Sequence, residues 1–346
     1  MTSMADRVTG GVDTHLHVHV AAALDGAGGL LGTASFPASS SGYRRLLGWL
    51  CRFGDVELVG VEGTGSYGAG LTRHLQAEGV AVVEVDRPNR QARRRRGKSD
   101  TVDAVAAARA AQSGDATGLA KARDGNVESM RVLRLVKLSA RKSKTIALNQ
   151  MRSIVATGPE ELRSDMRDLP AAKLVERALG LRPGGRLDPL NATKIALRQL
   201  ARRIKGLDTE IDAVSTLIEP LVAASAPELL ACNGVGPDVA AALLIAAGDN
   251  PERLRSERSF AKLCGVAPLD ASSGKQQRHR YSRAGDRQAN SALWRIVMTR
   301  IVYDPRTAAY INRRMKDGLT KREAMRCLKR YVAREVFQLL PRSRAA

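Results

Sequence analysis

The chain has 346 residues, which is long for one compact domain and sufficient for two domains with a connecting element. Its 56 Lys and Arg residues outnumber its 35 Asp and Glu residues, for a formal net charge of +21. The longest apolar run, 239–247, is about half a membrane span, so we expect no membrane protein. The four cysteines form no CxxC pair, and we expect them to be reduced and buried rather than part of a disulfide scaffold.

The positive charge is unevenly distributed along the chain. Residues 1–90 hold seven basic and nine acidic side chains, whereas residues 91–346 hold 49 basic and 26 acidic ones. This increase in positive charge after residue 90 indicates a polyanionic partner, most commonly nucleic acid. Aromatic residues make up only 3% of the chain, so contacts from arginine to the backbone fit better than base stacking.

Residues 8–112 read as an α/β domain. The sequence predicts strands first and then strands that alternate with helices, which is typical of a mixed sheet. The expected strands are 8–14, 18–24, 30–36, 56–61 and 80–85, and the expected helices are 43–53, 67–78 and 100–112.

Residues 127–224 read as wholly helical, with a turn at Pro183–Gly185. In the second half of this region, apolar residues are spaced alternately three and four residues apart, which is the pattern of a coiled-coil seam. They are Leu197, Leu200, Ile204, Leu207, Ile211, Val214 and Ile218. The simplest interpretation is a long antiparallel arm whose seam pairs within the chain or between two chains. Residues 226–340 form a third, mostly helical region.

Four carboxylates are candidates for a metal site. Asp13 and Glu62 each end a predicted strand, and such residues tend to meet at one edge of an α/β sheet. Asp100 and Asp103 stand three residues apart at the start of a helix and share a face. Hard divalent cations prefer oxygen ligands and serve phosphoryl displacement, so the set could hold Mg²⁺ or Mn²⁺. Taken singly, each acid could equally be a helix cap or a surface charge.

Residues 229–249 resemble a helix-hairpin-helix. Gly234 and Gly236 allow a tight turn, whose backbone N–H groups could hold a DNA phosphate together with the N-terminus of the next helix. The alternative is a plain corner between two core helices. The run Arg93, Arg94, Arg95 and Arg96 is likewise either a phosphate clamp or a solvated loop.

A third group lies in a basic loop that contains Ser272, Ser273 and Gly274. A serine there could attack phosphorus if its proton is removed and the developing charge is neutralised. From residue chemistry alone, a loop that only contacts phosphate is the simpler interpretation. Its neighbouring cations are Lys275, Arg278, Arg280 and Arg283.

Three histidines, His15, His17 and His19, alternate along the sequence. On one strand they would share a face and could bind zinc. No cysteine or carboxylate stands at a customary spacing to complete such a site.

In these segments the chain resembles the DEDD-type insertion-sequence transposases, the IS110 family of bridge-RNA-guided recombinases. Six short motifs occur in the family's order over nearly the whole chain. They are Gly11-Val-Asp13-Thr-His, Val61-Glu62-Gly-Thr-Gly-Ser-Tyr, Lys98-Ser-Asp100-Thr-Val-Asp103-Ala, Asn233-Gly-Val-Gly-Pro, Gly265-Val-Ala-Pro and Ser273-Gly274.

The resemblance implies an RNase H-like (RuvC-like) domain in 1–115, a helical coiled-coil arm in 125–224, and a mostly α domain with the helix-hairpin-helix in 226–340. It implies that Asp13, Glu62, Asp100 and Asp103 hold Mg²⁺ and that Ser273 forms a covalent link to DNA. It further implies a homo-oligomer, dimers assembling to a tetramer, and a structured guide RNA that pairs with target and donor DNA.

The expected function is therefore site-specific DNA recombination by an enzyme of an insertion sequence. One alternative is a hydrolytic RuvC-like nuclease or junction resolvase, in which the acids activate water. Another is a nucleic-acid-binding protein without catalysis. We expect a bacterial cytoplasmic protein, associated with the nucleoid when active and with no membrane partner.

Overall fold

The computed structural model describes residues 7–85, 99–116, 118–250, 253–254, 256–270, 279–280 and 285–341. The chain forms two compact units. The first contains the N-terminal residues up to Gly125 together with 246–262, and the second contains 126–245 and 263–340. The segment 246–262 falls in the third region of the sequence-based division, so the boundaries of that division stay a prediction.

The first unit is built on a six-stranded mixed sheet in the order β3-β2-β1-β4-β5-β6. Strand β1 pairs antiparallel with β2 and parallel with β4, so it lies at the centre, and β5 continues the parallel part. The mixed α/β order predicted from the sequence is confirmed. The strands are β1 (Arg7–Thr14), β2 (Val18–Leu24), β3 (Leu30–Pro37), β4 (Asp55–Glu62), β5 (Ala81–Val85) and β6 (Gly118–Leu119).

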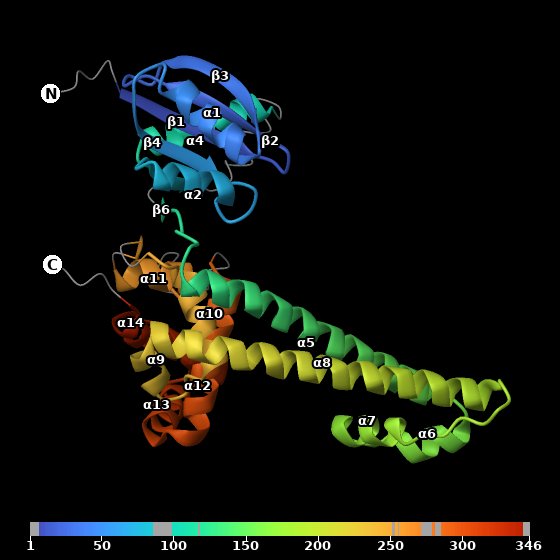
Figure 1. Cartoon of the computed structure of the whole chain (residues 1–346). Coiled ribbons are helices and arrows are strands. Elements are labelled where there is room, and N and C mark those ends of the chain that lie inside the picture. Colours follow the sequence, from blue (N-terminus) through green and yellow to red (C-terminus); the bar gives the residue numbers. More distant parts are fainter. Residues whose placement is uncertain are drawn as a thin grey trace. The chain divides into compact units, whose positions relative to one another are not determined.

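Helices cover both faces of this sheet (Figure 1). Helices α1 (Ser40–Leu50) and α2 (Ala69–Ala77) bury leucines against one face, with Val12 and Ala21 of the sheet in the same core. Helix α4 (Asp100–Gln112) packs on the other face, where Ala104 contacts Val20 and Ala22. Alternate residues of β1 and β2 therefore point to opposite helical layers.

Two glycines let α4 lie directly on the strands. A Cβ atom at Gly11 would stand 2.1 Å from the backbone nitrogen of Ala108, and one at Gly60 would stand 2.5 Å from the carbonyl oxygen of Ala107. The facing side of α4 is made of alanines. Since neither surface carries a large side chain, the helix backbone approaches the sheet closely, and this fixes the height of its first turn above β1.

The segment 246–262 is fastened to the end of the sheet. Asn250 donates from Nδ2 to the carbonyl oxygen of Ala120 at 3.0 Å, and Arg253 donates from Nε to that of Leu119 at 2.9 Å. Arg253 also stands 3.8 Å from the carboxylate of Glu84 on β5. The first unit is therefore completed by residues far along the chain.

The second unit contains a long arm of two helices that lie side by side, α5 (Asn126–Thr157) and α8 (Pro189–Ser225) (Figure 1). Short helices α6 (Glu160–Met166) and α7 (Ala171–Leu179) connect them and share an apolar core with them. Of the predicted seam, Leu197, Ile204 and Ile218 are buried, and the residues between are half-buried. The seam therefore packs in part within the chain.

The rest of the second unit is also mostly helical, as expected. A two-stranded ladder, in which β7 pairs antiparallel with β8, is an element that the sequence did not predict. These elements are α9 (Pro227–Ala231), α10 (Pro237–Ala247), β7 (Leu269–Asp270), β8 (His279–Arg280), α12 (Arg287–Tyr303), α13 (Pro305–Lys316) and α14 (Lys321–Leu339). Helix α11 (Glu257–Leu263) belongs to the first unit except for Leu263, and α10 belongs to the second unit except for its last two residues.

Three expectations need correction. Helix α1 begins at Ser40 rather than residue 43, because the Ser39 side chain accepts a hydrogen bond from the backbone N–H of Gly42 and caps the helix. The three histidines do not share a strand, because β1 ends at Thr14 and β2 begins at Val18. Cys51 is exposed, although we expected buried cysteines. Among the described residues, no helix is long and apolar enough to span a membrane.

Candidate functional site

Asp13 and Glu62 end two neighbouring parallel strands. The register pairs Val12 of β1 with Val61 of β4, so the next residues of the two strands, Asp13 and Glu62, lie side by side at the edge of the sheet. The Thr14 hydroxyl donates to the carbonyl oxygen of Glu62 at 2.7 Å and ties the two strand ends together. Parallel pairing thus places the two acids at the ends of adjacent strands.

Helix α4 brings the other two acids to the same edge. Asp100 and Asp103 occupy its first turn, after Ser99 at the N-cap position. Asp103 is 5% exposed and Asp13 is 6% exposed, whereas Asp100 faces solvent. The positive end of the helix dipole partly offsets the charge of acids in this turn.

His15 is a neighbour of this site that the sequence did not assign to it. Its Nε2 stands 3.2 Å from an oxygen of Asp13 and 3.4 Å from an oxygen of Asp100. The turn after β1 folds the imidazole back over the acids. The adjacent motif residues Asp13-Thr-His15 held a signal for this contact, but grouping His15 with His17 and His19 as a possible zinc site hid it.

The pKa of Asp13 reflects its burial first and the neighbouring charges second. Burial raises the pKa of its carboxyl, Asp103 and Asp100 raise it further, and His15 opposes them. One ligand atom from each of Asp13, His15 and Asp100 lies within 4.8 Å of the others. A divalent cation would relieve this repulsion, and carboxylate oxygens are the ligands that Mg²⁺ and Mn²⁺ prefer. The donor set therefore fits such an ion.

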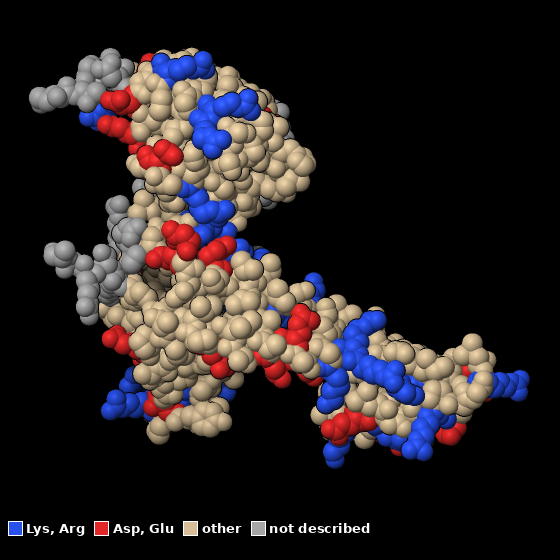
Figure 2. All heavy atoms as spheres, viewed as in Figure 1, with Lys and Arg blue, Asp and Glu red and all other residues tan. Residues whose placement is uncertain are grey.

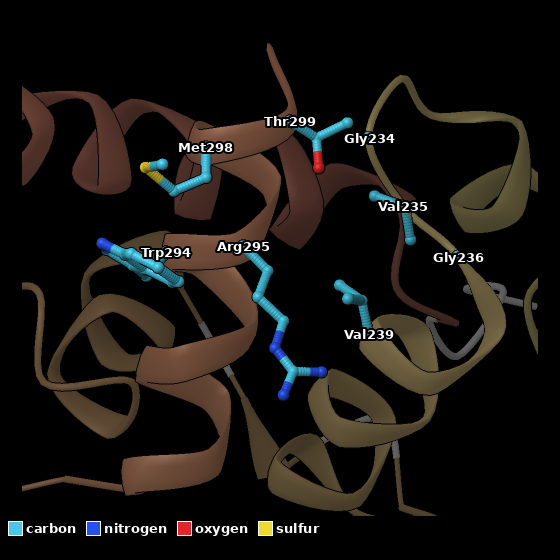
Figure 3. A pocket seen from close by; sticks show the side chains of 8 residues that line it. All are labelled: Gly234, Val235, Gly236, Val239, Trp294, Arg295, Met298 and Thr299. Carbon is cyan, nitrogen blue, oxygen red and sulfur yellow. The ribbon is translucent and has the colours of Figure 1, made fainter. Parts of the chain in front are cut away.

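In the second unit, the turn between α9 and α10 carries the two predicted hairpin glycines. Gly234 has φ +80°, a conformation that favours glycine, and a Cβ at Gly236 would meet only open space. This turn forms one wall of a pocket of about 520 Å³, and α12 supplies the other (Figure 3). The α12 residues are Trp294, Arg295, Met298 and Thr299.

A dense ion cluster lies beside this turn. Asp238, in the first turn of α10, stands 3.3 Å from Nζ of Lys137 and 3.1 Å from guanidinium nitrogens of Arg141 and Arg295, with Arg134 at 3.8 Å. Although burial raises the pKa of Asp238, Lys137, Arg134 and Arg141 outweigh it and hold the pKa below its usual value. The cluster leaves an excess of positive charge next to the turn.

Several predicted site residues lie outside the described residues. They are Arg93, Arg94, Arg95, Arg96, Ser273, Lys275, Arg278 and Arg283. The backbone of Arg280 lies in β8, and its side chain is not described. Because β7 and β8 pair antiparallel, the two chain ends that flank 271–278 lie next to each other. The roles of these residues stay predictions.

Comparison with known families matches both regions that hold these sites. A family model of DEDD transposases of the IS110 group, described as "Transposase", matches residues 10–157, which include all four acids. A second model, described as "Transposase IS116/IS110/IS902 family", matches residues 226–312, which include the α9–α10 turn. The chain carries the domains of an IS110-family transposase. No curated protein matches its sequence.

These domains mark the chain as a DNA transposase enzyme. The mixed sheet of the first unit, followed by a mostly helical region, fits a DEDD transposase domain of RNase H-like type. Such a domain indicates the use of a divalent metal, in agreement with the acidic cluster of the transposase. DNA is accordingly a partner of this chain.

Proposed function

We propose that the chain is a site-specific recombinase that cuts and rejoins DNA through a covalent phosphoserine at Ser273. The observation that supports this proposal is the cluster of Asp13, His15 and Asp100, whose ligand atoms lie within 4.8 Å of one another, with Asp103 in the same first turn of α4 as Asp100. Asp13 and Asp103 are nearly inaccessible to solvent. Nearly buried acids crowded together are costly unless a cation compensates them.

The four acids would hold Mg²⁺ or Mn²⁺, with His15 beside them. A bound divalent ion neutralises the negative charge that develops on a phosphate oxygen during displacement. The chain's own part is to position the strand and the serine. Helix α4 holds Asp100 and Asp103 at a fixed height above β1, and the bond from Thr14 to Glu62 holds the two strand ends together.

In the proposed step, the hydroxyl oxygen of Ser273 forms a bond to phosphorus and loses its proton. The bond from phosphorus to one deoxyribose oxygen breaks, and that oxygen leaves as a hydroxyl after it is protonated. Since the number of phosphate ester bonds is unchanged, a deoxyribose hydroxyl of another strand can reverse the step and rejoin the DNA. A hydrolase would instead use water and release the energy of the ester bond.

The nucleic acid would be held mainly through its backbone. The α9–α10 turn with Gly234 and Gly236 offers backbone N–H groups and lies beside the positive ion cluster. We assign phosphate contacts to Arg93, Arg94, Arg95, Arg96, Lys275, Arg278, Arg280 and Arg283 as well. A structured guide RNA would select target and donor DNA by base pairing, while the protein reads backbone and shape.

We also propose that copies of the chain assemble as dimers and then as a tetramer. Helix α5 supports this proposal, because Val132, Leu135 and Val136 expose 48, 64 and 42% of their surfaces on the arm. Neighbouring apolar side chains on one helix are typical of an interface. The assembly would work at the nucleoid, where its DNA lies.

A denaturing gel tests the chemistry directly. Labelled DNA with a candidate site is incubated with Mg²⁺, RNA transcribed from the gene's flank, and either wild type or Ser273→Ala. We expect a slow, protease-sensitive DNA band with wild type only. Cut DNA in both lanes without that band would instead establish hydrolysis by the acids and overturn the phosphoserine.

A further inference from the structure

A polar pocket of about 480 Å³ lies on the first unit, between the N-terminus of α1 and helix α2. Ser39, Ser40, Tyr43 and Arg44 line it from α1, and Arg73 and His74 line it from α2. Figure 2 shows Lys and Arg side chains over the part of this unit where α1 lies in Figure 1. These residues belong to none of the sequence motifs described above.

The charge of the pocket is positive and uncompensated. No Asp or Glu lines it, and within the described part of the chain neither Arg44 nor Arg73 forms an ion pair. Both arginines are exposed, so each guanidinium is free to bind an anion. Arginine offers planar, forked donors that match the oxygens of phosphate.

The N-terminus of α1 adds donors of the same kind. Ser39 caps the helix through its side chain, which accepts from the N–H of Gly42 at 3.2 Å. The N–H groups of Ser40 and Ser41 precede the first intrahelical bond, as in every α-helix. These groups and the positive end of the helix dipole favour an anion in front of the first turn.

A stack of rings forms the inner wall of the pocket. Tyr43 stacks on His19 with centroids 5.6 Å apart, and the ring of His74 is 6.2 Å from that of Tyr43. His19 is fully buried behind Tyr43, whereas His74 is half-buried and lines the pocket. The ring stack therefore gives the pocket a packed wall, from which His74 can offer a ring nitrogen.

We propose that this pocket binds a phosphate of a nucleic-acid strand. Arg44 and Arg73 supply the charge, while His74 and the first turn of α1 supply further hydrogen bonds. The pocket suits a phosphate rather than a base, because its lining is polar and the one aromatic side chain that lines it already stacks on His19. The proposal does not depend on the chemistry of Ser273.

The pocket is distinct from the acidic site but lies near it. His19 pairs with Thr14 across β2 and β1, and Thr14 directly follows Asp13. Because successive strand residues point to opposite faces, the acids lie on the α4 side of the sheet and the pocket lies on the α1 and α2 side. A strand that crosses this sheet edge would be anchored by one phosphate while another reaches the acids.

The test compares two double variants of the full chain in a Ser273→Ala background, which separates binding from cleavage. Arg44→Gln with Arg73→Gln removes the charge of the pocket. Arg45→Gln with Arg52→Gln removes the same charge from exposed positions on or next to α1 that do not line it. Affinity for labelled duplex DNA and for labelled RNA is measured by fluorescence anisotropy over a range of salt concentrations.

We expect the pocket variant to lose about tenfold in affinity and to lower the slope of log affinity against log salt by about one. The control should change the slope by much less. Comparison of the DNA and RNA arms identifies which strand occupies the pocket. Equal effects of the two double variants would overturn the proposal, because only the general positive charge would then matter.

A charge-neutral variant gives an independent test. A Cβ at Gly70 would stand 2.7 Å from the hydroxyl oxygen of Tyr43, so Gly70→Ala should displace that ring and obstruct the pocket. It should weaken strand binding as the pocket variant does, with the fold checked by circular dichroism. If millimolar inorganic phosphate raises the Tm of the Ser273→Ala chain while all variants bind strands normally, the pocket serves a small phosphate compound and the proposal is wrong.

Discussion

The hydroxyl of Thr14 donates to the main-chain carbonyl oxygen of Glu62 at 2.7 Å, across the ends of β1 and β4. The bond therefore links Thr14, which directly follows Asp13, to the backbone of Glu62. Replacing Thr14 by valine keeps the shape and removes the donor. We expect a loss of about 1 kcal/mol in the free energy of unfolding and a fall of about tenfold in strand cleavage.

The control for this prediction is Thr33→Val, which removes an exposed hydroxyl from β3, a strand that β2 and β1 separate from β4 and Glu62. Cleavage assays and thermal unfolding should leave that variant close to wild type. Full activity of Thr14→Val would show that the spacing of Asp13 and Glu62 does not depend on this bond.

Asp13 should lower the stability of the metal-free protein. Burial raises the pKa of its carboxyl, and Asp103 and Asp100 add to the effect. An acid whose pKa rises on folding holds its proton more tightly in the folded state, so stability is lost as pH rises through the folded pKa. At pH 7.5 without metal, Asp13→Asn should therefore have a higher Tm than wild type, while its cleavage activity is abolished.

Addition of metal should raise the Tm of wild type above that of Asp13→Asn. At a hundredfold excess over Kd, Mg²⁺ should stabilise wild type by about 2.7 kcal/mol. Asp13→Asn should show little response in the same thermal scans. A variant that cleaves DNA, or that responds to Mg²⁺ as wild type does, would remove Asp13 from the metal site.

Gly11 should tolerate no side chain. A Cβ there would stand 2.1 Å from the backbone nitrogen of Ala108, so Gly11→Ala must push α4 away from β1. We expect a loss of about 3 kcal/mol in urea unfolding and, because Asp100 and Asp103 move with the helix, loss of stabilisation by Mg²⁺. Gly48→Ala is the matched control, since Gly48 lies in α1 with nothing within 4 Å of an added Cβ. It should be neutral or slightly stabilising.

Asp238 should contribute strongly to the stability of the second unit. Lys137 and Arg134, with side chains 6 and 8% exposed, would be left as uncompensated cations in Asp238→Asn. Removing one member of such a buried cluster costs about 3–5 kcal/mol. Asp208→Asn, which breaks the half-exposed pair with Lys144 on the arm, should cost at most about 1 kcal/mol. Similar urea midpoints for the two variants would contradict this assignment.

The sequence predicted the elements that carry the four acids, because the patterns that define these elements are local. Asp13 and Glu62 follow apolar strands, and the spacing of Asp100 and Asp103 places both on one helical turn. His15 was missed because its position depends on a turn that reverses the chain after Thr14. The α1–α2 pocket could not be predicted, since it combines residues about thirty positions apart that meet only when both helices pack on the sheet.

Residues 246–262 have a consequence for the order in which the protein is made. Ala120 accepts its hydrogen bond from Asn250, which follows 130 residues later in the chain. The carbonyl oxygen of Leu119 likewise accepts its hydrogen bond from Arg253, which is also synthesised much later. On the ribosome, the unit that carries the acids would therefore close only when most of the chain has emerged. Ser273 follows shortly after, so a nascent chain would complete the unit that carries the acids and the proposed nucleophile at nearly the same moment.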